Sequence, residues 1–122
     1  MNVKQLKEKY QDNAIEDFGC IMSPSAKKFA MDFKNTLKSI LKPYGCEVAS
    51  FNVGHYYFSG FIKKEDKCLY FSREIERYDM PINLNRNFLI RKAKGVNDFR
   101  GERNEYCTLE EFERLATKLL EI

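Results

Sequence analysis

The chain lacks several features on which common functional assignments rest. It contains no tryptophan and one histidine among 122 residues, and no apolar run approaches the roughly 20 residues that a membrane helix needs. Its first residues, MNVKQLKEKYQDN, contain no apolar signal-peptide core. We therefore expect a cytoplasmic protein that makes no contact with a membrane.

Metal-binding and redox motifs are also missing. The four cysteines, Cys20, Cys46, Cys68 and Cys107, are far apart and form no C-x-x-C pair, and His55 is the only histidine. Structural zinc sites usually show close pairs of such ligands. We expect reduced thiols that pack as small apolar side chains, a structural or surface role for His55, and no metal or cofactor.

Enzyme signatures are equally scarce. The chain has no G-x-S-x-G turn, no calcium loop of the D-x-D-x-D-G type and no glycine-rich phosphate loop. Carboxylates that could hold a metal ion occur at Glu74, Glu76 and Asp98, although neighbouring acids are more often a solvated strand edge. We therefore predict that the protein is not an enzyme.

Composition fits one globular domain over residues 1–122. Apolar residues make up 43% and charged residues 32%, which is enough apolar material for a core. The net charge of +3 is only mildly basic, so charge by itself does not identify a nucleic-acid partner.

Apolar residues recur at helical spacing in three segments. Val3–Tyr10 is short and needs a packing partner. Ser23–Leu41 begins with a capping serine followed by Pro24, which suits the first helical position. Thr108–Leu120 opens with the capping box formed by Thr108 and Glu111. The sequence thus predicts two N-terminal helices and one C-terminal helix.

Between these helices the pattern changes to alternation. It predicts strands over Cys46–Val53, Tyr56–Lys63, Cys68–Ser72 and Ile82–Lys94, the last with its core at the run FLIRKA, followed by a loop over Gly95–Cys107. Short turns cannot make parallel crossovers. The expected fold class is α+β, with a central antiparallel sheet of three to five strands on which the helices pack.

Aromatic residues are concentrated in Ala49–Arg73, on both faces of the expected hairpin. The apolar stripes of the long helices need a sheet face to cover, and this hairpin is the only sufficient one. We infer that most of its aromatic residues are core and that a central strand pair is covered, at least partly, on both sides.

The candidate site is the basic segment from Arg86 to Tyr106. The residues that we expect to make contacts are Arg91, Lys94, Phe99, Arg100, Arg103 and Tyr106. Arginine beside aromatic residues suits a protein interface, and equally suits phosphate contacts with base stacking. A third interpretation is a solvated strand and loop whose arginines pair with nearby acids.

A second set of cations lies on the long helix. Its members are Lys27, Lys28, Lys34 and Lys38, with Lys42 after the helix. A lysine-rich helix face usually serves solubility. Should this face lie beside the loop that carries Arg100, the two sets would form one basic patch.

Two sequence pieces together resemble small proteins of phages and other mobile elements of low-GC bacteria. The first is YFSGF at Tyr57–Phe61 with the following LYFS, and the second is LIRKAK at Leu89–Lys94 with NDFRG and Asn104. The resemblance covers residues 56–112. Glu102 departs from it, because a second glycine would be expected there. Such proteins often work by binding and blocking a host machine, as anti-CRISPR inhibitors do.

These observations lead to three functional hypotheses. The first is a non-enzymatic binding protein of a mobile element that acts stoichiometrically on a host protein or nucleoprotein complex, such as a CRISPR or other defence nuclease. The alternative is a protein that binds nucleic acid directly through residues 86–106. The third is a metal-dependent nuclease. Pairing of two copies through exposed aromatic residues at a sheet edge is a further expectation.

Overall fold

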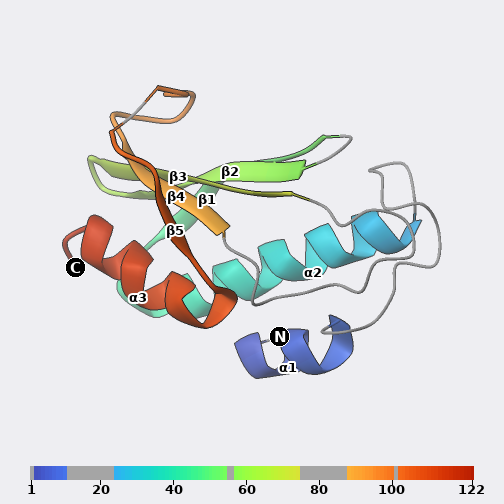
Figure 1. Ribbon diagram of the computed structural model, residues 1–122. Helices are drawn as coiled ribbons and strands as arrows, with labels where there is room; N and C mark the ends of the chain where they lie inside the picture. The colour runs from blue at the N-terminus through green and yellow to red at the C-terminus, as the bar shows by residue number, and fades with distance from the viewer. Residues whose placement is uncertain (1, 11–23, 55–56, 75–87, 101) are drawn as a thin grey trace.

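The computed structural model describes residues 2–10, 24–54, 57–74, 88–100 and 102–122. Figure 1 shows helices packed beneath one sheet. The elements, in chain order, are α1 (Val3–Tyr10), α2 (Pro24–Leu41), the short 3-10 helix η1 (Lys42–Tyr44), β1 (Glu47–Val53), β2 (Tyr57–Lys64), β3 (Lys67–Glu74), β4 (Phe88–Ala93), β5 (Glu105–Cys107) and α3 (Leu109–Leu119). The α+β class and the predicted arrangement of helices are confirmed.

The sheet is an antiparallel meander in which the strand order β1-β2-β3-β4-β5 follows the chain. The prediction of an uninterrupted loop over Gly95–Cys107 is wrong at its end, because β5 pairs Cys107 with Phe88 and Glu105 with Ile90. A strand of three residues is too short to show an alternating pattern. Only its pairing with β4 defines it.

One face of the sheet, the inner face, packs on α2 and α3. Its buried side chains are Phe58, Ile62, Leu69, Phe71, Phe88 and Ile90. From α2, the Phe33 ring stacks on Phe88 with centroids 5.2 Å apart, and it lies 4.9 Å from the Phe58 ring. The opposite parity of each strand forms the outer face, as the alternation predicts.

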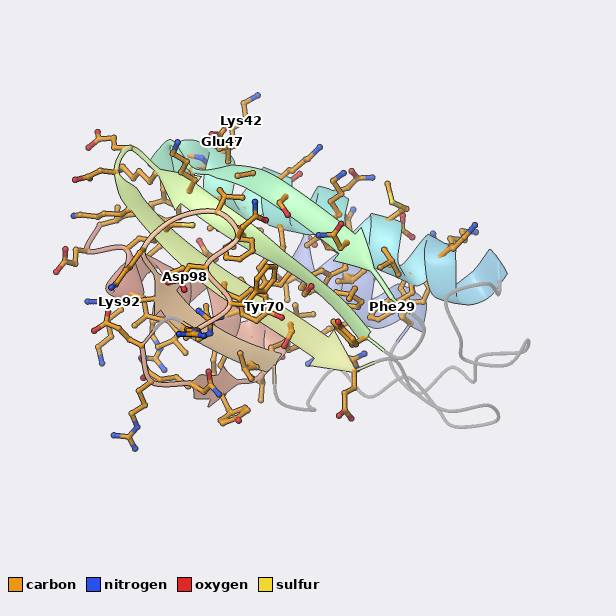
Figure 2. The ribbon with its side chains drawn as sticks, turned by 90° about the horizontal axis from the view of Figure 1, so that it is seen from above. Phe29, Lys42, Glu47, Tyr70, Lys92 and Asp98 are labelled. Carbon is orange, nitrogen blue, oxygen red and sulfur yellow. The ribbon has the colours of Figure 1, made fainter. Side chains whose placement is uncertain are left out.

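The outer face is partly covered as well. Phe61 points away from the helices, yet it is only 1% exposed, because Tyr70 from β3 and Phe99 from the following loop pack against it. Figure 2 looks down on this face and shows Tyr70 and the Asp98 loop on the viewer's side of the sheet. The expectation of a strand pair covered on both sides is confirmed.

One of the two predicted helix caps lies within the described residues. At α3, the Thr108 side chain accepts a hydrogen bond from the Glu111 backbone, and the Glu111 carboxylate accepts one from the Thr108 backbone, so the capping box is confirmed. The predicted cap of α2, Ser23, lies outside the described residues.

The first helix packs on the core through Leu6 and Tyr10 and is also bonded to a carboxylate of α2. Asp32 accepts hydrogen bonds from Lys9 Nζ at 2.8 Å and from the Tyr10 hydroxyl at 2.5 Å. Burial works to raise the pKa of Asp32, but these two hydrogen bonds outweigh it and hold the pKa below its ordinary value. Folding therefore favours the ionised carboxylate.

We expect the Asp32→Asn variant to be less stable than the wild type at neutral pH. Because the folded-state pKa of Asp32 is depressed, its contribution is present above the unfolded-state pKa and disappears as pH falls through the folded-state value, which lies below 3.8. Urea unfolding at a series of pH values should show the difference between the two proteins shrinking below that point. A difference independent of pH would contradict this account.

Gly60 marks a close approach between β1 and β2. A Cβ placed there would lie 2.3 Å from the Ser50 carbonyl oxygen and 2.8 Å from the Phe71 ring. The register of β1 against β2 also shifts between Val48 and Ser50. Glycine is needed at this position because the neighbouring backbone occupies the space of a side chain.

Accordingly, Gly60→Ala should lower the free energy of unfolding by about 1–3 kcal/mol, the usual cost of overpacking. The matched control is Gly95→Ala, since a Cβ at Gly95 would meet no atom within 4 Å. The control should leave stability unchanged or raise it by up to about 1 kcal/mol. Urea denaturation of both variants measures this, and equal effects would show that the contact at Gly60 is not limiting.

Candidate functional site

The loop after β4 folds back over the outer face of the sheet. The carboxylate of Asp98 accepts hydrogen bonds from the backbone N–H of Lys94 at 2.9 Å and of Arg100 at 3.1 Å. Asn97 takes a left-handed conformation with φ of 74°, which asparagine tolerates better than most residues. These local features of Asn97 and Asp98 shape the loop so that Phe99, which follows Asp98, packs on the sheet.

Phe99 joins the loop to the sheet. Its ring lies edge-on to Phe61 at 5.6 Å and to Tyr70 at 6.1 Å between centroids. The side chain nevertheless remains 64% exposed. Phe99 thus fixes the loop with one part of its ring and presents the rest to solvent.

Arg91 lies beneath this loop and is 4% exposed. It stands opposite Tyr70 in the β3–β4 register, and its guanidinium lies 4.5 Å from the centre of the Tyr70 ring. Its Nη2 donates a hydrogen bond to the Asp98 carbonyl oxygen at 3.0 Å. Its Nη1 has no hydrogen-bond partner among the described residues.

A hollow of about 340 Å³ opens beside Arg91. It is lined by Tyr70, Ser72, Leu89, Arg91, Phe99, Arg100 and Asn104. A second hollow of about 580 Å³ is lined by Arg103, Asn104, Glu105 and Tyr106. Because Asn104 lines both, the two hollows adjoin, and we call them together the outer-face site.

The structure brings five of the six predicted contact residues to this site. Arg91, Phe99 and Arg100 line the first hollow, and Arg103 and Tyr106 line the second. Lys94 is exposed at the base of the loop and lines neither of these two hollows. Arg91 forms part of the buried floor of the site, whereas Phe99 and Tyr106 are exposed.

Sequence reasoning missed five lining residues of the outer-face site, which are Tyr70, Ser72, Leu89, Asn104 and Glu105. Tyr70 and Ser72 share the outward parity of β3, which the alternation does indicate. Their place opposite Arg91 and Leu89 depends on the register between β3 and β4, which separate sequence segments do not reveal.

The lysines of α2 lie on the other side of the sheet. Helix α2 packs on the inner face through Phe33, whereas the loop that carries Arg100 packs on the outer face through Phe99. Figure 1 shows α2 below the sheet and this loop above it. The two sets of cations therefore do not merge into one basic patch.

The described cysteines, Cys46, Cys68 and Cys107, are free thiols. Burial raises the pKa of each, and that of Cys107 to about 12, so all three stay protonated at neutral pH. Three further candidates, Cys20, His55 and Glu76, lie outside the described residues.

Within the described ranges, no group of three or more histidine, cysteine, aspartate or glutamate side chains is arranged to hold a metal ion. None of the helices in those ranges combines the length and apolar character needed to span a membrane. Comparisons with models of protein families, with curated proteins and with solved structures found no significant match.

If Phe99 holds the loop in place, Phe99→Ala should make it easier to cleave. Aromatic contacts of this kind contribute about 1 kcal/mol each, so we expect roughly tenfold faster trypsin cleavage after Lys94 or Arg100. The control is Val96→Ala, which removes an exposed apolar side chain from the same loop. Equal cleavage rates for the two variants in limited proteolysis would contradict the proposed role.

Proposed function

We propose that the protein is a non-enzymatic binding protein that acts stoichiometrically on a host protein or nucleoprotein complex through the outer-face site. The observation that carries this proposal is the exposure of Phe99 and Tyr106, at 64% and 60%, beside Arg100 and Arg103. Arginine and aromatic side chains dominate the energetics of protein interfaces. Tyr106 lies on β5, and Phe99 is held against the sheet by Phe61 and Tyr70, which reduces the conformational entropy that binding would cost.

The resemblance to mobile-element proteins supports the choice of partner. It spans Tyr57–Phe61 with Leu69–Ser72, and Leu89–Lys94 with the loop to Asn104. The segments from β3, β4 and the loop line the outer-face site, and Phe61 from β2 packs against Phe99. A protein of this kind would block a host machine, for example a CRISPR or other defence nuclease, in the cytoplasm of a low-GC bacterium.

Direct nucleic-acid binding is the second candidate, because guanidinium groups beside exposed rings suit phosphates and stacked bases. The separation of the α2 lysines from this site weighs against it, since no continuous basic track results. A metal-dependent nuclease is the least supported alternative. The carboxylate of Asp98 is bonded to the backbone of its own loop, away from the strand end that carries Glu74.

The test is capture of a partner from a lysate of a low-GC bacterium by the tagged protein. The double variant Arg100→Glu with Arg103→Glu should lose the partner, because both charges at the site are reversed. The matched control is Lys27→Glu with Lys38→Glu, which reverses two exposed charges on α2 and should retain it. Loss in both variants, or retention in both, would refute the assignment of the site.

Two further measurements separate the candidate functions. Inhibition of a captured nuclease should reach its end point at one copy per partner, as a stoichiometric mechanism requires. Retention on DNA or RNA that falls steeply between low and moderate salt would instead favour the nucleic-acid candidate, because phosphate contacts release counterions.

A further inference from the structure

The guanidinium of Arg91 is buried with one of its donors unused. Its Nη1 has almost no contact with solvent and no acceptor among the described residues, and none of the carboxylates there forms an ion pair with Arg91. Burying a charged donor without an acceptor costs more free energy than burying a neutral one. Nη1 itself is not accessible from the hollow, but a negative charge held there would stabilise the buried guanidinium through space.

The described residues that line the hollow next to Arg91 offer donors and include no acid. Besides Arg91, the described lining residues include Arg100, Asn104, Tyr70 and Ser72, whose side chains can all donate hydrogen bonds, and none of those described is an aspartate or glutamate. The nearby Asp98 meets Arg91 through its carbonyl oxygen, while its carboxylate accepts from two backbone N–H groups. An entering anion would therefore encounter hydrogen-bond donors without facing an acid in the lining.

We infer that this hollow binds a single carboxylate group carried by a peptide segment of the protein partner. The inference rests on the proposed function and specifies the chemistry of the partner. Arg91 provides the buried charge, and Arg100 and Asn104 complete the donor set from the exposed side. The carboxylate belongs to an acidic side chain or to a chain terminus.

Charge and shape favour a carboxylate over a phosphate. Two lining side chains, Arg91 and Arg100, are cationic. Asp98 is not a lining residue, but its carboxylate lies in the same loop, so these three side chains together carry one net positive charge. That charge matches a monovalent carboxylate better than a phosphate dianion. The planar guanidinium of Arg100, which is exposed, also suits bidentate pairing with a carboxylate.

Phe99 at the rim explains why a peptide should bind better than a free carboxylate. Its exposed ring borders the hollow and would contact the stem of an acidic side chain or the adjoining backbone. Such apolar contact excludes water from the ion pair, which strengthens it.

The experiment uses the full chain and four probes. They are Ac-Ala-Ala-Glu-Ala-Ala-NH₂, the same peptide with Gln in place of Glu, acetylated penta-alanine with a free C-terminus, and inorganic phosphate. Titration is followed through the side-chain Nε–H NMR signals of the arginines. We expect the Arg91 signal to shift saturably, with a dissociation constant on the order of 1 mM, for one or both carboxylate peptides.

The comparison between probes decides the chemistry. A response to the Glu peptide alone assigns an acidic side chain, and a response to the free C-terminus alone assigns a chain end. The Gln peptide should cause no shift. Equal binding of the Gln peptide, phosphate binding at least as tight as that of the peptides, or no shift with any probe would overturn the inference.

Variants test the donor set. Asn104→Ala and Arg100→Gln should each weaken peptide binding by about fivefold to tenfold, and Lys38→Gln on α2 should leave it unchanged. Arg91→Lys retains the charge but loses the planar fork, so binding should fall further. Should Arg91→Lys fail to fold, Asn104→Ala still decides, because its side chain is exposed.

Failure here is distinguishable from failure of the proposed function. If the partner is captured and lost on reversal of Arg100 and Arg103, yet no carboxylate peptide binds and Asn104→Ala captures normally, the carboxylate inference fails alone. If no partner depends on the outer-face site, the proposed function fails, whatever the peptides do.

Discussion

The packing of Phe33 against the inner face of the sheet is the contact on which the rest of the structure depends. Its ring contacts those of Phe58, Phe71, Phe88 and Phe112, so one side chain of α2 joins β2, β3, β4 and α3. Because side chains alternate along a strand, burial of these rings also decides which residues face outward. The outer-face site is thus a consequence of the core on the opposite side.

The position of the Arg91 side chain follows from the same packing. Its neighbour in the sequence, Ile90, is fixed in the core, so Arg91 must point outward, under the loop that Asp98 and Phe99 hold over the sheet. The Tyr70 ring and one backbone carbonyl stabilise its charge in part. A folded protein can keep a cation with incomplete hydrogen bonding where the surrounding packing is stable enough to offset the cost. Such arrangements are common at binding sites.

Much of the fold could be predicted from local patterns. The helical spacing of Val3–Tyr10, the capping box at Thr108 and the alternation around Tyr57–Lys64 each identify an element by signals within a few residues. The strand β5 could not be predicted, because its three residues gain their conformation from β4. The exposure of Phe99 and Tyr106 follows from their loop and edge-strand positions, but the burial of Arg91 depends on pairing with β3 and on the covering loop, which no local pattern encodes.

The two edge strands of the sheet, β1 and β5, are short or irregular, and this affects whether two copies of the chain can pair edge to edge. Strand β5 offers three residues of backbone to a neighbour, and β1, at the other edge, has an irregular register between Val48 and Ser50. Short or irregular edges are poor templates for a further strand. The described edges therefore disfavour self-association by extension of the sheet. Pairing of two copies through side chains would instead use exposed rings such as those of Phe99 and Tyr106, the same rings through which we propose that a partner binds.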